Sequence, residues 1–157
     1  MKLNLILNTT IVFLMMFILA RKRLHVFINI FIFMLLEFII TSYFAILSIN
    51  IKAWELSEQT ELILIFYIYE VILLPFIYLW YFNLNEVIQK KWLKAMLIVV
   101  LVGVLSLLEY LLVVWEVITY VNWHLWQSLL AFIIICIVMK YLQRGFIQIL
   151  QREGIHD

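Results

Sequence analysis

The sequence has little of what catalytic and disulfide-bonded proteins depend on: its 157 residues include one cysteine, one proline and three glycines. The single cysteine, Cys136, excludes an intramolecular disulfide and a cysteine-based metal cluster. The zinc-protease motif HExxH, the nucleophile elbow GxSxG, the P-loop and the dinucleotide motif GxGxxG are all missing. His124 and Ser128 stand four residues apart, but helices produce that spacing by coincidence more often than as a catalytic dyad. We therefore expect that this protein is not an enzyme.

Charged residues are also scarce. Only 13% of the residues are charged, whereas 68% are hydrophobic and the mean hydropathy is +1.13. An ordinary soluble domain has ~25% charged and ~45–50% apolar residues. The composition therefore indicates an integral membrane protein whose main partner is the lipid bilayer, and it gives no reason to expect nucleic-acid binding. The chain has room for about five spans of ~20 residues each.

The apolar runs predict an all-α integral membrane protein, a bundle of five transmembrane helices in a single domain, residues 1–157. We expect the spans at about 3–20, 24–51, 62–84, 92–118 and 123–142. A cleaved signal peptide is the alternative for the first run, but the strongest basic cluster follows that run instead of preceding it. Pro75 removes a backbone donor and predicts a kink in the third span. The tail, 143–157, predicts a short amphipathic C-terminal helix at the interface or, as the alternative, a continuation of the fifth span.

The distribution of Lys and Arg predicts the orientation of the five spans. Residues Arg21, Lys22, Arg23, Lys90, Lys91, Lys94, Lys140, Arg144 and Arg152 fall on one side, and Lys2 and Lys52 on the other. The positive-inside rule then places the N-terminus outside and the C-terminus in the cytoplasm. The acidic Lys52–Glu61 loop and the turn at Trp123 would face outwards.

Acidic side chains lie deep within three of the predicted spans. Glu37, Glu70 and Glu109 fall near the middle of the second, third and fourth spans, and Glu116 lies nearer the outer surface. An acidic side chain at the bilayer centre costs roughly 2.5–3.5 kcal/mol, and such residues almost always face the bundle interior. Glu109 and Glu116 are seven residues apart and share one helical face. We therefore expect an outward-facing polar cavity lined by these four glutamates.

Basic residues do not enter this zone, so the carboxyl groups must be neutralised by protonation, by a bound cation or by His124 reaching in from the turn. Tyr120, Trp123 and His124 could form the lid of the cavity. The functional interpretation is a site for a proton, a cation or a small polar ligand, although no spaced motif names a metal or a cofactor. The alternative is that protonated Glu37, Glu70 and Glu109 are interhelical hydrogen-bond glue, each contact contributing ~0.6–2 kcal/mol.

The hairpin of the last two predicted spans, EYLLVVWEVITYVNWHLW (Glu109–Trp126), resembles the signature of an uncharacterised family of small multi-spanning membrane proteins from endospore-forming Gram-positive bacteria. Tyr120 and Trp123 match that signature, and its second tryptophan is displaced here to Trp126. The run PFIYLWYFN (Pro75–Asn83) is similar to a proline followed by aromatic residues and asparagine in the family's third span. The resemblance implies about five spans and a bacterial cell (inner) membrane, with no assigned activity.

The expected protein is thus a small, multi-pass bacterial inner-membrane protein whose intramembrane glutamates bind or pass a proton, a cation or a small polar ligand. The alternative is a structural or assembly subunit of a larger membrane complex, sporulation-related, that contacts another membrane protein or associates with itself.

Overall fold

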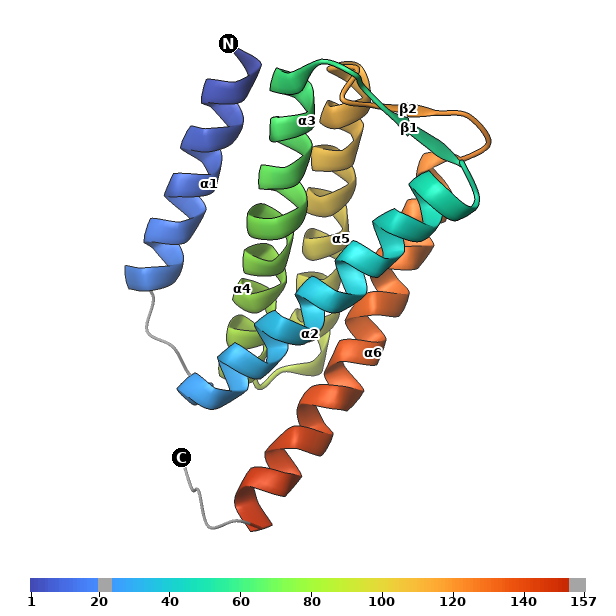
Figure 1. Ribbon diagram of the computed structural model, residues 1–157. Helices are drawn as coiled ribbons and strands as arrows, with labels where there is room; N and C mark the ends of the chain where they lie inside the picture. Colours follow the sequence, from blue (N-terminus) through green and yellow to red (C-terminus); the bar gives the residue numbers. More distant parts are fainter. Residues whose placement is uncertain (20–23, 153–157) are drawn as a thin grey trace.

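The computed structural model describes residues 1–19 and 24–152, which form a bundle of helices with a small sheet at one end (Figure 1). In chain order the elements are α1 (Lys2–Leu19), α2 (Val26–Ala45), the π-helical η1 (Ile46–Asn50), β1 (Trp54–Leu56), α3 (Thr60–Tyr67), the π-helical η2 (Ile68–Leu73), α4 (Leu74–Val87), α5 (Lys91–Val114), β2 (Ile118–Tyr120) and α6 (Leu125–Arg152).

Five helical stretches within the described residues are long and apolar enough to cross a membrane. They are Lys2–Leu19, Val26–Asn50, Thr60–Val87, Lys91–Val114 and Leu125–Arg152. The predicted class, a helical protein with five candidate spans, is therefore confirmed. The orientation relative to the cytoplasm stays a prediction. The basic cluster Arg21–Arg23 and residues 153–157 of the predicted tail lie outside the described residues.

The third stretch, Thr60–Val87, is the centre of the bundle. It comprises α3, η2 and α4, and it packs against α1, α2 and α5. In its most apolar 18-residue segment 61% of the residues are buried, whereas 17–28% are buried in the corresponding segments of the other four stretches. Figure 1 shows α1 beside α3 and α4, while α2 crosses the bundle obliquely. The four outer helices therefore present most of their apolar surface outwards, as a bilayer requires.

The proline of the third stretch follows a π-helical turn. Pro75 lies at the start of α4, directly after the π-helical turn Ile68–Leu73. Proline has no N–H group and its ring crowds the preceding turn, so local π-helical geometry relieves the conflict without ending the helix. The predicted kink at Pro75 stays a prediction; the π-helical segment before it contains Glu70.

Two short strands close one end of the bundle, which we call the sheet end. β1 and β2 pair antiparallel with Trp54 opposite Tyr120, Glu55 opposite Thr119 and Leu56 opposite Ile118. The purely helical prediction did not include them. They join the connection after α2 to the connection between α5 and α6, so these two loops lie at the same end of the molecule (Figure 1).

Each strand begins two residues after a residue with left-handed backbone. Lys52, with φ 52°, precedes β1, and Glu116, with φ 59°, precedes β2. After α5 the Val117 N–H donates to the Leu112 carbonyl at 2.9 Å, and the Glu116 N–H donates to the Val113 carbonyl at 3.0 Å. This is the Schellman arrangement that ends helices, with Glu116 at the position where glycine is usual.

The last helix is continuous. α6 runs from Leu125 to Arg152 without a break at Gly145, so the chain continues the fifth span instead of forming a separate tail helix there. A glycine inside a helix costs only ~1 kcal/mol relative to alanine. Phe146 stacks on Phe31 of α2 with ring centroids 3.9 Å apart, and this contact holds the turn after Gly145 against the bundle.

Buried amides fix the end opposite the sheet. The Asn83 side chain of α4 donates to the Asn29 carbonyl oxygen of α2 at 2.7 Å and to the Leu79 main-chain carbonyl at 3.0 Å. The Asn29 amide donates in turn to the Leu24 carbonyl at 2.9 Å. Polar contacts between apolar helices are therefore present at both ends of the bundle.

Candidate functional site

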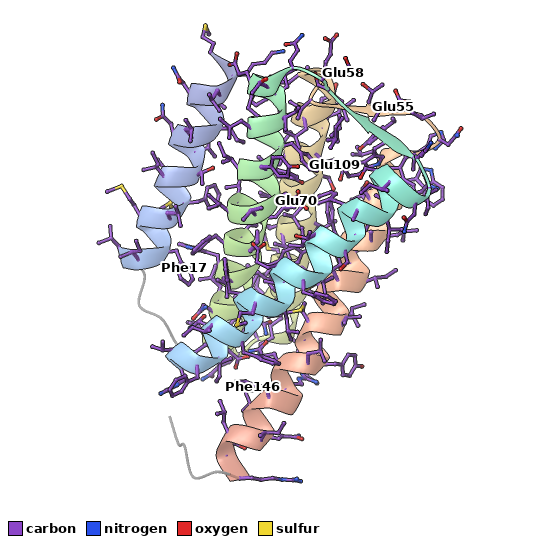
Figure 2. The ribbon with its side chains drawn as sticks, in the orientation of Figure 1. Phe17, Glu55, Glu58, Glu70, Glu109 and Phe146 are labelled. Carbon is purple, nitrogen blue, oxygen red and sulfur yellow. The ribbon has the colours of Figure 1, made fainter. Side chains whose placement is uncertain are left out.

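The carboxyl group of Glu109, on α5, is the most deeply buried acid of the described chain, with 0% of the residue exposed. Its Oε1 atom accepts hydrogen bonds from the Tyr120 phenol and, at 2.5 Å, from the Ser128 hydroxyl. The Ser128 oxygen accepts a hydrogen bond from the Trp123 indole N–H at 2.8 Å. Figure 2 shows Glu109 inside the bundle, near the sheet end. We call Glu109, Tyr120, Trp123 and Ser128 the Glu109 site.

The chain reversal after α5 brings these residues together. Because the helix ends at Val114 and Glu116 turns the backbone, β2 runs back across the end of α5 and Tyr120 can reach Glu109. Ser128 lies in the first turn of α6, which packs against α5. One carboxyl oxygen therefore links α5, β2 and α6.

The second carboxyl oxygen has no partner. Within the described part of the chain Glu109 Oε2 is buried and makes no hydrogen bond, and the buried Tyr69 hydroxyl makes none either, whereas the Tyr43 hydroxyl interacts with Ser128. Tyr43 on α2 and Tyr69 on η2 both lie within electrostatic range of Glu109. Glu109, Tyr43 and Tyr69 thus bring oxygen atoms from three different helical stretches within electrostatic range of one another.

Aromatic rings close the site towards the sheet end. The Trp54 ring of β1 lies 6.0 Å from the Tyr120 ring and 6.1 Å from the Tyr43 ring, measured between centroids. Trp54 is itself buried. Glu109 is therefore enclosed beneath the sheet, whereas the sequence led us to expect an outward-facing cavity lined by the glutamates.

Tyr120 lies on β2, outside the spans, and its protonation state is set by this enclosure. Burial, followed by the hydrogen bond to Glu109, raises the pKa of the Tyr120 phenol above its usual value. The phenol is therefore protonated at neutral pH, as a donor to Glu109 must be.

Glu70 and Glu37 form a separate group nearer the middle of the bundle. Glu70, on η2, is buried, and Glu37, on α2, is half-buried and close enough for the two charges to interact. Glu37 lines a shallow groove on the outer face of α2 together with Phe38, Thr41, Ser42 and Ala45. Glu70 thus lies within electrostatic range of Glu37 and interacts with the Thr41 side chain of α2.

Glu116 and His124 are not part of either group. Both side chains are exposed. We expected Glu116 to share a helical face with Glu109, but α5 ends before it, and Glu116 occupies the left-handed position of the helix end. The His124 backbone N–H donates to the Gln127 side chain at 2.8 Å, which places His124 at the start of α6. Of the six predicted site residues, only Glu109 and Tyr120 come into contact through a hydrogen bond in the described residues.

Sequence reasoning did not assign Tyr43, Trp54 or Tyr69 to the site. Tyr43 follows Thr41 and Ser42, and this polar run inside an apolar span was the signal that could have found it. Trp54 and Tyr69 carry no such signal, because tryptophan and tyrosine are common at membrane interfaces.

The site offers oxygen atoms and aromatic rings but no metal-binding set. Over residues 1–19 and 24–152 no group of three or more His, Cys, Asp and Glu side chains is arranged to hold a metal ion. Comparison with known protein families, with curated proteins and with solved structures found no match for this chain.

Proposed function

We propose that this chain is a small bacterial inner-membrane protein that binds and releases a proton at Glu109. The observation that carries the proposal is the pairing at this carboxyl group: Oε1 accepts two hydrogen bonds from neutral hydroxyls, and Oε2 is buried without a partner in the described chain. A buried carboxylate without a cation is strongly disfavoured, whereas a protonated carboxyl group needs no counter-charge.

The neighbouring hydroxyls support proton exchange at this position. The hydroxyls of Tyr43 and Tyr69 interact electrostatically with Glu109, and a phenol can both donate and accept a hydrogen bond. Tyr120 extends the hydrogen-bonded chain from Glu109 to the sheet end. Such a chain gives a proton bound at Glu109 a polar route towards the surface through groups that both donate and accept.

Infrared difference spectroscopy on the protein in lipid tests whether Glu109 carries a proton. We expect a protonated carboxyl band that is lost in Glu109→Gln and retained in Glu58→Gln, where the replaced acid is exposed in the loop after β1. Glutamine keeps the size of the side chain and an acceptor oxygen for Tyr120 and Ser128. An unchanged band in correctly folded Glu109→Gln protein would assign the proton elsewhere.

Proton movement is tested separately in liposomes that contain a pH-sensitive dye. With an imposed membrane potential, we expect proton flux through wild-type protein, a loss of that flux in Glu109→Gln, and no effect of Glu58→Gln. Glu70→Gln shows whether the second acid group takes part. A band or flux that depends on added sodium or potassium instead of pH would identify the ligand as a metal cation.

A second candidate function is structural: a subunit of a larger, sporulation-related membrane assembly in which the glutamates hold helices together. It is favoured by the fact that the hydrogen bonds of Glu109 Oε1 join three elements. Purification in mild detergent from the native membrane separates the two candidates. A stoichiometric partner together with unchanged proton flux in Glu109→Gln would support the structural function.

A further inference from the structure

A groove of about 250 Å³ lies between the end of α1, the start of α2 and the middle of α4, away from the sheet. Its walls include Phe17 of α1, Ile30 and Phe33 of α2, and Phe76 and Leu79 of α4. Figure 2 shows Phe17 near the end of α1, far from the sheet. All three helices belong to stretches that can cross a membrane, so a bilayer would surround the groove. We call it the α1–α2 groove.

The groove is open on one side and closed on the other. Ile30 is 50% exposed, whereas Leu79, which also lines the groove, is 3% exposed. The rings of Phe17 and Phe33 both pack against the Phe76 ring, with centroids 5.3 and 5.5 Å apart. A molecule in the surrounding bilayer can therefore enter past α2 and meet aromatic rings from three helices.

Water and polar ligands are poor occupants of this groove. Among the described residues that line it, Asn29 is the one polar side chain. Its amide nitrogen donates to the Leu24 and His25 carbonyls at 2.9 and 3.3 Å, and its oxygen accepts from Asn83 at 2.7 Å. A buried water needs two to four polar partners, which the remaining aliphatic and aromatic side chains do not offer. The lining therefore favours a hydrocarbon.

The volume separates a hydrocarbon chain from a helix of another protein. One turn of a helix, about 10 Å across and 5.4 Å long, occupies roughly 400 Å³. The groove holds about 250 Å³, which is less than a single turn. An extended acyl chain is much thinner than a helix, so it can follow the groove between the three walls.

Basic side chains gather at this end of the bundle, at the start of α5 and in the last part of α6, among them Lys90, Lys91, Lys94, Lys140 and Arg144. Phe146 stacks on Phe31, which places this part of α6 beside the first half of α2. Glu86 is an acid at the same end, and the basic residues outnumber it. Basic residues next to membrane helices attract anionic headgroups. The charge at the groove therefore favours an anionic lipid.

We propose that the α1–α2 groove binds one acyl chain of an anionic phospholipid, whose headgroup lies at the basic end of the bundle. The groove is separate from Glu109, which lies near the sheet, so the proposal is independent of proton binding. A chain that moves from the bilayer into an apolar groove gains no hydrophobic free energy. It is retained by van der Waals contact with rings on several sides and by attraction of its headgroup to basic side chains.

Photo-cross-linking tests where the acyl chain lies. The protein is reconstituted in vesicles of phosphatidylcholine that contain phosphatidylglycerol with a diazirine on one acyl chain, and adducts are located by peptide mass spectrometry. We expect adducts on Leu79, a buried lining residue, as well as on exposed residues such as Met34. Adducts confined to exposed residues would overturn the proposal. That result would also follow if another protein or a second copy occupied the groove.

A filled groove provides the matched comparison. Ile30→Trp places a large ring in the groove from its open side, and Met34→Trp places the same ring at an exposed position of α2 that does not line it. We expect loss of the Leu79 adduct in Ile30→Trp and retention of it in Met34→Trp. Helix content and thermal stability like those of the wild type show that Ile30→Trp is folded. Equal Leu79 yields in the two variants would contradict binding in the groove.

Competition between lipids tests the headgroup. Unlabelled phosphatidylglycerol should displace the probe from Leu79 about fivefold more effectively than phosphatidylcholine at the same mole fraction, as one contact with a Lys or Arg would give. High salt should reduce this difference, because it screens charges at the surface. Equal displacement by the two lipids would contradict the choice of an anionic lipid.

Discussion

The Tyr120 phenol donates a hydrogen bond to the buried carboxyl group of Glu109 and thereby fastens a strand outside the spans to an acid inside them. The two residues are eleven positions apart, and the chain reverses direction between them. The strand that covers Glu109 is therefore hydrogen-bonded to the group that it covers. Stability of the sheet end and protonation at Glu109 should depend on each other.

Removal of this phenol should weaken the sheet end. Tyr120→Phe keeps the ring beside Trp54 but leaves Glu109 with Ser128 as its donor, so we expect a loss of about 0.5–1.5 kcal/mol in the free energy of unfolding. Thermal unfolding in detergent measures the loss. Tyr110→Phe, at an exposed position of α5, is the matched control and should change stability little. Equal effects of the two substitutions would show that the hydrogen bond contributes nothing.

Alkaline pH should destabilise the protein partly through Tyr120. Its folded-state pKa is raised, first by burial, whereas the unfolded chain has the ordinary value of 10.0. The folded state therefore binds more protons above that pH, and stability falls as pH rises. The contribution is fully present below pH 10.0 and is lost as pH increases towards the folded-state pKa. In an unfolding series from neutral to alkaline pH, wild type should lose more stability than Tyr120→Phe; parallel curves would contradict this assignment.

The strand pairing can be trapped covalently. Glu55 and Thr119 are exposed and lie directly opposite each other, so Cβ atoms at these positions are about 4.5–5.5 Å apart. In a Cys136→Ser background, the pair Glu55→Cys and Thr119→Cys should form a disulfide on mild oxidation and stabilise the protein by about 2–4 kcal/mol. Gel mobility and thermal unfolding, each with and without reductant, provide the measurement. The pair Glu58→Cys and Thr119→Cys, which is out of register, should oxidise much less.

The left-handed residue after α5 offers a stabilising substitution. Glu116 holds φ at 59°, which costs a residue with a Cβ roughly 1–2 kcal/mol. Glu116→Gly should therefore raise the free energy of unfolding by up to about 1 kcal/mol, because part of the gain is lost to the freedom of glycine in the unfolded chain. Glu58→Gly, elsewhere in an exposed loop, is the comparison. A loss of stability or of proton flux in Glu116→Gly would show that this carboxyl group has a role beyond the helix end.

The sequence and structure agree where long apolar runs decide the outcome. Five stretches of this length and hydropathy have few alternatives to membrane-spanning helices, so the helical class could be predicted. The end of α5 could not be predicted from periodicity, because the usual signal is a glycine and this chain uses Glu116. The β-branched run of Val117, Ile118 and Thr119 is typical of a strand, but its partner lies more than sixty residues earlier in the sequence.

The same distinction applies to the candidate site, where contacts between residues close in the sequence could be predicted and contacts between separate helices could not. Glu109 and Tyr120 are close in the chain, and their contact was within reach of sequence reasoning about the turn. Whether the acids would share one cavity depended on the directions in which separate helices face. The widened turn at η2 lies at Glu70, and the structure places this acid beside Glu37. Helical spacing within a single span does not show which neighbouring helix its acid faces, so the position of Glu70 relative to Glu37 could not be predicted.

Pairing of β1 with β2 has a consequence for the order of assembly. Two further helical stretches, Thr60–Val87 and Lys91–Val114, are synthesised between β1 and β2, so β1 cannot find its partner until α5 and the following turn have been made. Until then Trp54 has no Tyr120 to pack against, and Glu109 enters the bilayer without its roof. The sheet can therefore close only after the first four helical stretches have been made, and Ser128 of α6 joins Glu109 afterwards.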